Sequence, residues 1–401
     1  MEDRRPLKVV FLAPFGIRPK GTVLARMLPL AVELQTLGTE VVIIAPPYTN
    51  PEDSGKVEEV RGVRLVNVSL PKGGKLVSTL LLSLRMFRAA LAEKPGLIHL
   101  FKPKGYGGIA AMLVIAVRNL GVRLPPVVVD TDDWEGKGGM NELHSYSKTE
   151  KAVFEFQERW LLPHSSAVTV ASRELEKKSL EVGVAPGKLF YLPNCVEGGT
   201  RGNGAAARAK VGIPLDATVL LLYTRFFEFE QERLHKVLDG IHRELPDVRI
   251  LVVGKGRHGE ESQLAAAAAT LGFAGVLHQA GWIEPAELPD YLAAGDVALY
   301  LFEDNLINRC KCPAKLTELL SASVAVVGDR VGQIAEYIRD GEGGLLCRPD
   351  NWQEMVAAAV ALLKDPARRT ALGKEGRRSM LESFNWHGYA TSLHDFYLRS
   401  L

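Results

Sequence analysis

DVALYLFEDNLINRCKCPAKLTELL, residues 296–320, places an apolar run directly before a helical pattern, and this succession decides the fold. The run 296–302 is apolar almost throughout, which is typical of a parallel strand covered on both faces. Pro313 suits the first turn of a helix, because the amide hydrogen that proline lacks has no partner there. The segment therefore predicts a strand, a loop and a helix, the repeating unit of an α/β fold.

The same succession repeats along the whole chain in two series. Glycine, proline or aspartate bounds many of the runs, and helix-period apolar residues at 22–37 and 107–120 lie between runs of the first series. Such alternation predicts βαβ units and a parallel sheet in each series. The predicted strands are 7–13, 40–46, 63–70, 97–101, 126–132 and 167–172 in the first series, and 218–225, 248–256, 275–283, 296–302 and 323–329 in the second.

The most turn-rich stretch of the chain, GGTRGNG at 198–204, separates the two series and is predicted to be an interdomain linker. We therefore expect an α/β fold with two Rossmann-like domains, residues 1–197 and 205–383, that face a central cleft. The aromatic-rich segment 384–401 is predicted to be a terminal helix. Ligands of open parallel sheets bind beyond the carboxyl ends of the strands, so the cleft is the expected site.

Length and composition exclude several classes of protein. A chain of 401 residues with 47% hydrophobic and 24% charged residues has an ordinary globular composition, not that of a disordered chain, a coiled coil or a collagen. Its formal net charge of +2 is too balanced for general nucleic-acid binding. Four cysteines are too few for a disulfide framework and favour the cytoplasm. No apolar run approaches the ~20 residues of a membrane span.

The predicted helix in 296–320 begins where a strand ends, so its first amide groups and its positive dipole end would face the cleft. Arg309, Lys311 and Lys315 add positive charge at the same place. Glu318, one turn into the helix, is suited to accept hydrogen bonds from a vicinal diol such as ribose. The alternative is a solvated helix start in which Glu318 balances Lys315.

Two other strand ends carry polar groups. Arg225 ends the run 218–225 and could hold a diphosphate across the same crevice, with a surface arginine as the alternative. The turn that contains Asp130, Asp132 and Asp133 has three open readings. It could bind a divalent metal, orient an acceptor hydroxyl as a general base, or cap the helix that follows.

Two further patterns argue against NAD binding and against a zinc site, and a third leaves two possible roles for a histidine. Gly254 follows a strand, but the third glycine of the dinucleotide fingerprint is missing, so NAD binding is not expected. The pair Cys310 and Cys312 lacks two partner ligands nearby, so we predict no zinc site. His99 either faces the cleft or is a buried histidine with its hydrogen bonds satisfied.

Several motifs together resemble the nucleotide-sugar glycosyltransferases of the GT-B fold. Within these the chain is most similar to glycosyltransferase family 4, the retaining, glycogen-synthase-like group. The resemblance implies transfer of a sugar from a nucleotide-diphosphate sugar to an acceptor hydroxyl, by same-face attack with retention, without a metal or another cofactor. It also implies a terminal helix that packs back toward the first domain. The motifs are PNCVE at 193–197, the strand ending in Arg225, CPAKLTELL at 312–320, GDRVGQIAEYI at 328–338 and DGEGGLLCRPDN at 340–351.

The resemblance assigns roles residue by residue. Arg225 would neutralise the donor diphosphate, Glu318 would hold the ribose hydroxyls, and the backbone near Leu316 and Leu319 would meet the phosphates. Trp282 lies where the family holds its base. The predicted donor-binding residues are Gly16, Arg225, Trp282, Ile283, Asn308, Arg309, Pro313, Leu316, Glu318 and Leu319, and the predicted catalytic residues are Arg225, Lys311, Lys315, Asp132 and Asp133.

Three departures from the family pattern affect these roles. Glu230 and Gln231 stand where the family usually has a lysine about five residues after the arginine. Cys310 replaces a second glutamate, and the turn 130–136 replaces a histidine. We expect Asn308, Arg309 and Lys311 to supply the lost contacts, with Lys311 as the second cation for the phosphates. The departures leave open a catalytically degenerate nucleotide-sugar-binding partner or a GT-B sugar-nucleotide epimerase.

Three basic loops of the first series follow predicted strands, at 18–22, 71–75 and 102–105. Their charge would favour an anionic acceptor, such as a lipid-linked or acidic saccharide. The neighbouring stretch 75–91 is apolar on most faces with basic residues at its edge, so it is either an interfacial membrane helix or a core helix. The first reading predicts peripheral contact with the inner membrane face from the cytoplasm.

Overall fold

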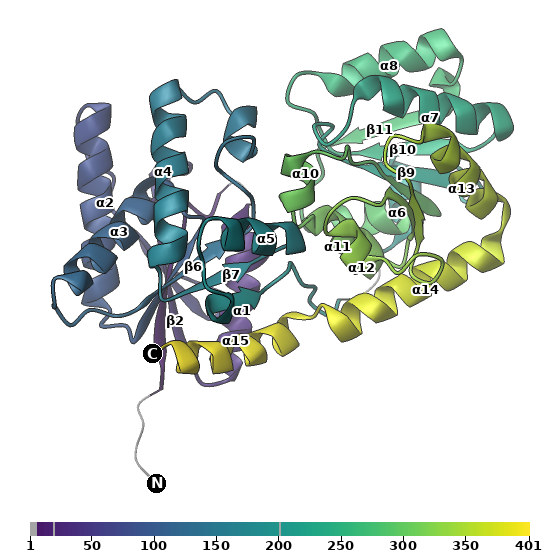
Figure 1. The fold of residues 1–401 in the computed structure, drawn as a ribbon. Coiled ribbons are helices and arrows are strands. Elements are labelled where there is room, and N and C mark those ends of the chain that lie inside the picture. The colour runs from purple at the N-terminus through teal and green to yellow at the C-terminus, as the bar shows by residue number, and fades with distance from the viewer. Residues whose placement is uncertain (1–5, 19–20, 200–201) are drawn as a thin grey trace. The chain divides into compact units, whose positions relative to one another are not determined.

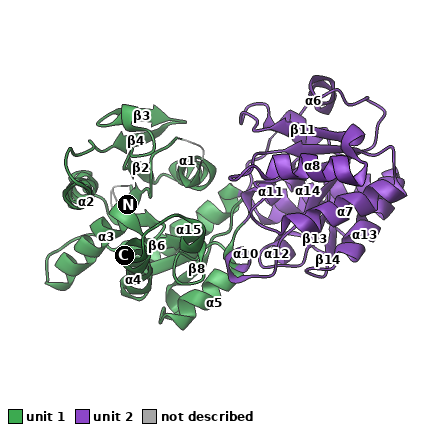
Figure 2. Ribbon diagram, turned by 90° about the horizontal axis from the view of Figure 1, so that it is seen from above, with its two compact units in different colours: residues 1–195, 310–312, 386–401 green, residues 196–309, 313–385 purple. Residues whose placement is uncertain are grey.

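The computed structural model describes residues 6–18, 21–199 and 202–401 and divides into two compact units. Unit 1 comprises residues 1–195, 310–312 and 386–401, and unit 2 comprises residues 196–309 and 313–385 (Figure 2). Each unit is built around its own mainly parallel sheet with helices on both faces (Figure 1). The expected α/β fold with two Rossmann-like halves is confirmed.

The sheet of unit 1 has the strand order β3-β4-β2-β1-β5-β6-β7-β8, with parallel neighbours and an antiparallel pair β3–β4 at one edge. The strands predicted from apolar runs are present, because these runs are buried on both faces. The edge strands β3 and β8 were missed, since β3 has two glutamates at its centre and β8 is only three residues long. The strands are β1 Lys8–Leu12, β2 Glu40–Ala45, β3 Val57–Val60, β4 Val63–Asn67, β5 Leu97–Phe101, β6 Val127–Thr131, β7 Ala167–Val170 and β8 Leu189–Tyr191.

The helices of unit 1 pack in two groups. Contacts join α2 to α3 and α3 to α4, whereas α15 packs along α1 and buries Trp386, Leu393 and Tyr397 in the core beside β1 and β2. The terminal helix is therefore part of the first unit. The helices are α1 Leu28–Thr36, α2 Lys75–Ala92, α3 Gly105–Asn119, α4 Lys148–His164, α5 Arg173–Glu181 and α15 Trp386–Ser400, with a π-helical turn Val23–Met27 before α1 and 3-10 turns at Pro51–Asp53, Met140–Leu143 and Pro186–Lys188.

The sheet of unit 2 has the order β11-β10-β9-β12-β13-β14, with parallel neighbours. Its first strand in the chain, β9, therefore lies at the centre, and the loops after β10, β9 and β12 leave the same edge next to one another. The five predicted strands are present, and the short edge strand β14 was missed. The strands are β9 Val219–Tyr223, β10 Arg249–Val253, β11 Leu277–Gly281, β12 Val297–Tyr300, β13 Ala325–Asp329 and β14 Leu345–Cys347.

In unit 2, α7 packs on α8 and α13, α11 packs on α14, α13 also contacts α14, and α6 packs on α9. Helix α11 begins at Ala314 with Pro313 just before it, so the predicted helix of 296–320 is present but starts one residue later. The helices are α6 Gly204–Lys210, α7 Gln231–Glu244, α8 Glu260–Leu271, α9 Leu288–Ala293, α10 Leu306–Cys310, α11 Ala314–Ser321, α12 Ile334–Tyr337, α13 Trp352–Lys364 and α14 Pro366–Ser383, with a 3-10 turn at Ala274–Val276.

The boundary between the units falls at Cys195 and Val196, just before the predicted linker 198–204. Residues 200 and 201 of that linker lie outside the described residues. The segment 310–312 belongs to unit 1, although α10 and α11 on either side of it belong mainly to unit 2. Across the described ranges, no helix combines the length and apolarity needed to cross a membrane.

Candidate functional site

At the carboxyl edge of the unit 2 sheet, Tyr223 joins two predicted site residues. Its hydroxyl donates a hydrogen bond to Glu318 Oε2 over 2.8 Å, and Lys315 Nζ lies 3.4 Å from the centre of its ring. Burial and the Glu318 carboxylate raise the pKa of Tyr223, so the phenol remains a proton donor. The end of β9 thus orients both charged side chains of α11.

Arg225 follows β9 by two residues and is half exposed, with 52% of its side chain accessible. Its guanidinium carbon lies 4.6 Å from the centre of the Phe227 ring, and Glu228 is 3.5 Å away. Between them, Phe226 has a φ of 66° and is buried, a conformation that is strained for a bulky side chain. The strained turn buries Phe226 and leaves Arg225 at the surface.

The other predicted donor residues of unit 2 lie in different settings. Trp282 is 59% exposed in the loop after β11, where Ile283 is half buried. Asn308 is buried and donates to the carbonyl oxygens of Glu228 and Glu303 over 2.8 and 3.0 Å, which occupies both hydrogens of its amide. Arg309 pairs with Asp304. The side chains of Leu316 and Leu319 are buried in the core, so only their backbone could meet a ligand.

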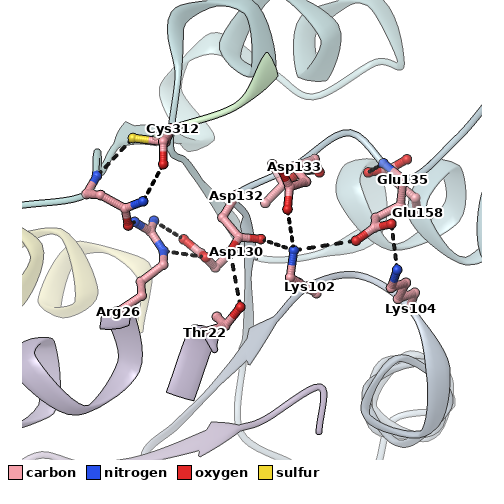
Figure 3. A network of polar contacts seen from close by, with 12 residues as sticks. Thr22, Arg26, Lys102, Lys104, Asp130, Asp132, Asp133, Glu135, Glu158 and Cys312 are labelled. Atoms are coloured by element: carbon pink, nitrogen blue, oxygen red, sulfur yellow. Dashed lines mark hydrogen bonds and ion pairs between the residues drawn. The ribbon is translucent and has the colours of Figure 1, made fainter. Parts of the chain in front are cut away.

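A cluster of buried charges occupies the carboxyl edge of the unit 1 sheet, centred on Lys102 (Figure 3). Lys102 Nζ lies 2.7 Å from Asp132 Oδ1, 2.7 Å from Asp133 Oδ2 and 3.5 Å from Glu135 Oε1. Its backbone has a φ of 61° directly after β5, an uncommon conformation for a lysine. The lysine is therefore held in a fixed position among three carboxylates.

The two aspartates respond differently to this cluster. Burial raises the pKa of Asp132, and the neighbouring Asp133 opposes its ionisation further. Burial also works against ionisation of Asp133, but Lys102 outweighs it and holds the pKa of Asp133 below its usual value. One carboxylate of the pair is thus kept charged.

Arg26 forms a second, fully buried pair with Asp130 beside this cluster (Figure 3). Its Nε and Nη2 donate to the two oxygens of Asp130 over 2.9 and 2.6 Å, and Nη1 donates to Asn194 Oδ1 over 3.2 Å. Asn194 Nδ2 in turn donates to the carbonyl oxygen of Cys312 over 2.5 Å, and Ser172 Oγ donates to that of Cys310 over 2.8 Å. These bonds fasten the segment 310–312 to unit 1.

Lys311 lies within that segment and is 5% exposed. It contributes, with Lys102, to the lowered pKa of Asp133. The sequence analysis predicts that Lys311 contacts the donor phosphates. In the structure, Lys311 instead lies in unit 1 and acts on Asp133 of the cluster around Lys102. Segment 310–312 could not be assigned to unit 1 from local sequence, because its neighbours on both sides follow the unit 2 pattern.

The loop 102–105 carries a second paired lysine. Lys104 Nζ lies 2.6 Å from Glu135 Oε2 and donates to Asn141 Oδ1 over 3.2 Å. Glu158 of α4 accepts from the backbone amides of Glu135 and Gly136 over 3.1 and 2.7 Å, and burial together with Glu135 raises its pKa to about 8. Both lysines of this basic loop are thus neutralised by the chain's own carboxylates, which the sequence prediction did not anticipate.

Four further predictions can be compared with the structure of unit 1. The aspartate turn caps no helix directly, because the 3-10 turn Met140–Leu143 that follows has Gly139 at its N-cap. Among the residues that the structure describes, no group of three or more His, Cys, Asp or Glu side chains is arranged to hold a metal ion. Gly16 is required by its own unit, since a side chain there would collide with Asn50. His99 is buried and bonded to Tyr397 and Thr169.

Family models match both halves of the chain. Residues 21–195 match the glycosyl transferase 4-like domain and residues 218–365 match glycosyl transferases group 1. The chain is 29% identical to D-inositol 3-phosphate glycosyltransferase of Kineococcus radiotolerans over 58% of its own length. The alignment covers 57% of that relative, so the chain spans little more than half of the curated protein it matches.

Solved structures share the fold over nearly the whole chain. Sucrose-phosphate synthase from Thermosynechococcus elongatus superposes with a TM-score of 0.73 at 17% identity, covering 98% of each chain. HepE from Anabaena, solved with UDP and glucose, gives the same score and identity over 98% of this chain and 100% of its own. The two family models together span most of the sequence, and the chain belongs to the GT-B glycosyltransferases of the glycosyltransferase 4-like type.

Proposed function

We propose that the protein transfers a sugar from a nucleoside-diphosphate sugar to an acceptor hydroxyl. The observation that carries the proposal is the arrangement of Lys315 and Glu318 of α11 around Tyr223 at the end of β9, with Arg225 two residues further along the chain. When the anomeric bond breaks, negative charge develops on the leaving diphosphate. Fixed cations and helix amide groups are suited to stabilise it.

The relatives support this choice of donor. HepE, which shares the fold, is solved with UDP and with UDP-glucose, and the curated relatives are named as glycosyltransferases. In this chain Glu318 would accept hydrogen bonds from the ribose hydroxyls, and Lys315 and Arg225 would meet the phosphates. Trp282, exposed after β11, would lie beside the base.

We further propose that transfer proceeds with retention and without a metal. In this mechanism the attack occurs on the face from which the diphosphate leaves, and the leaving phosphate helps to deprotonate the acceptor. Protein cations and the amides of α11 take the role that a metal would otherwise have. A proton NMR spectrum of the product tests retention, and unchanged turnover after chelator treatment tests metal independence; activity lost with chelator and restored by Mg²⁺ would disprove the latter.

Unit 1 is proposed to supply the acceptor groups. Asp133, kept ionised by Lys102, is the group we expect to orient the acceptor hydroxyl, with Asp132 beside it. A lipid-linked or acidic saccharide remains our proposed acceptor. Because Lys102 and Lys104 are already paired, the positive charge for such an acceptor would come from other residues, among them Lys72 and Arg88 next to or within α2.

The first half of α2 supports a peripheral membrane contact at the cytoplasmic face. Leu76 is 74% exposed, and Val77, Leu80 and Leu81 are exposed on the same two turns, while the second half of the helix packs on the unit. Basic side chains flank an apolar surface that anionic lipid would cover. Co-sedimentation with vesicles of anionic lipid at low salt should occur for the wild-type chain and fall in Leu80→Gln. Leu120→Gln, at an exposed leucine after α3, is the matched control.

Nucleotide release tests the central proposal. The chain is incubated with UDP-, GDP- and ADP-sugars, and slow release of one nucleotide is expected. Glu318→Gln should lower both donor affinity and release, whereas Glu287→Gln, an exposed residue paired with Lys210, should change neither. Binding of a donor without release would favour the degenerate partner protein, and conversion to an epimeric donor would favour the epimerase.

A further inference from the structure

Phe227 brings two arginines of unit 2 together at the sheet edge. The guanidinium carbon of Arg257 lies 4.7 Å from the centre of the Phe227 ring, and that of Arg225 lies 4.6 Å from the same centre. Arg225 follows β9 and Arg257 follows β10, and these strands are parallel neighbours. Both side chains are exposed. Two cations from loops about thirty residues apart thus share one aromatic ring.

The two loops are held against each other by their backbones. Gly254 has a φ of 121°, and a side chain at this position would collide with the carbonyl of Thr224. The amide of Thr224 donates to the carbonyl oxygen of Val253 over 3.0 Å. The loop after β10 therefore lies directly on the turn that carries Arg225, and only glycine permits so close an approach.

The nearby carboxylates are committed to the loop itself. Glu260 accepts from the amide of His258 over 2.7 Å, and Glu261 accepts from that of Gly256 over 3.1 Å. In the part of the chain that the structure describes, Arg257 forms no ion pair with a carboxylate. Arg225 has Glu228 at 3.5 Å. The cation–π contacts with Phe227 hold both guanidinium groups, and an anion such as a phosphate could form charge-assisted hydrogen bonds with them.

The position that the family pattern gives to a lysine offers no cation here. Glu230 lines a pocket of about 410 Å³ together with Glu232, Glu303 and Asp350. The two cations of this pocket are already paired, Arg233 with Asp329 and Lys236 with Glu232. Burial, with Glu230 nearby, raises the pKa of Glu303, as expected in surroundings rich in negative charge. Besides Arg225 and Lys315, a further cation for the donor would therefore have to come from another loop.

We propose that Arg257 is a phosphate-binding residue of the donor site, with Phe227 as the ring that positions it beside Arg225. The order of strands places the loop of Arg257 between the loop of Trp282 and that of Arg225. The phosphate next to the nucleoside is therefore the one that Arg257 meets, whereas Lys315 and α11 meet the distal phosphate. The inference rests on the proposed function, because it names a contact of the same donor.

Calorimetric titration of the full chain tests the assignment. The wild type is titrated with UDP, GDP and ADP, and then with the monophosphate and the nucleoside of the base that binds. Arg257→Gln should weaken binding of the diphosphate and of the monophosphate by at least about tenfold and leave the nucleoside unchanged. Lys255→Gln removes an exposed charge two residues away and should change each affinity by less than about twofold. Arg257→Lys should recover part of the loss, because it restores the charge without the planar fork.

The outcomes separate this inference from the proposed function. If Arg257→Gln binds the diphosphate and the monophosphate as the wild type does, Arg257 is not a phosphate ligand, and sugar transfer remains proposed. Loss of nucleoside binding to the same degree would also overturn the assignment, since it would indicate a contact with the base or ribose. If the wild type binds none of the three diphosphates, the proposed function fails and this inference with it.

Discussion

The charged clusters of the two units differ in what neutralises their cations. In unit 1, Arg26, Lys102 and Lys104 are largely buried, and each lies within 3 Å of a carboxylate oxygen. In unit 2, Arg225 and Arg257 are exposed and lie against a phenyl ring. Breaking a buried ion pair leaves an uncompensated charge in a low dielectric, whereas an exposed cation on a ring costs the fold little and can meet a ligand. Substitution of the buried Arg26–Asp130 pair should therefore change stability, and substitution of Arg225 or Arg257 should change binding.

Asp130→Asn tests the unit 1 side of this comparison most strongly. It leaves the buried guanidinium of Arg26 without its carboxylate, so the free energy of unfolding should fall by about 3–5 kcal/mol. Asp340→Asn, in the exposed pair with Arg330, is the control and should cost no more than about 1 kcal/mol. Urea unfolding measures both, and equal losses would contradict the comparison.

Glu158→Gln tests a buried acid of the same cluster through pH. The pKa of Glu158 in the folded chain, about 8, is above its usual value of 4.5, so the folded state binds more protons between these limits. The wild type should therefore lose stability as pH rises from 4.5 to 8, by at most about 1.4 kcal/mol per pH unit from this group. Glu158→Gln should flatten that slope in unfolding curves, even if its stability at pH 5 is lower. An unchanged slope would show that Glu158 does not carry the extra proton.

Arg225→Gln tests the unit 2 side. Loss of a charge-assisted contact to phosphate should weaken nucleoside-diphosphate binding by about 1.5–3 kcal/mol, and the free energy of unfolding should stay within about 0.5 kcal/mol of the wild type. Titration and urea unfolding on the same preparations make the comparison direct. A destabilised variant that binds nucleotide normally would reverse the roles assigned to the two clusters.

Lys311→Met tests whether Lys311 acts on Asp133 or binds the donor. The cation helps to hold the pKa of Asp133 below its usual value, so its removal should raise that pKa. If Asp133 acts as a carboxylate, the acid limb of the pH–rate profile should move to higher pH, while Lys102 continues to favour the charged form of Asp133. A loss of donor affinity of about 1.5–3 kcal/mol with an unshifted pH–rate profile would instead indicate that Lys311 binds the donor.

Much of the fold could be predicted because strands that are buried on both faces consist mainly of apolar residues. The strands β1, β5 and β9 are buried along most of their length, and their residues are apolar except for Lys8 in β1 and His99 in β5. The edge strand β3 has two glutamates at its centre, and β8 and β14 have only three residues each. None of these strands was therefore predicted from an apolar run.

The site was predicted in part for a similar reason. Glu318 and Lys315 could be found because they lie one turn apart on a helix that follows a strand. Tyr223 contacts both of these side chains, but the sequence predicts it only as one residue of an apolar strand. Lys102 was noticed as a basic loop residue, yet its three carboxylate partners lie thirty residues later, on the loop of a neighbouring strand.

The sequence by itself determined the two parallel sheets, their helices and the strand end at which the donor helix begins. Each of these depends on burial and periodicity within a short stretch of chain. Only the tertiary structure decided that Cys310–Cys312 belongs to unit 1, that Lys102 is enclosed by carboxylates, and that Phe227 gathers two arginines. These features depend on contacts between residues that are far apart in the sequence. Local sequence does not determine which segments become neighbours, so it cannot predict these contacts.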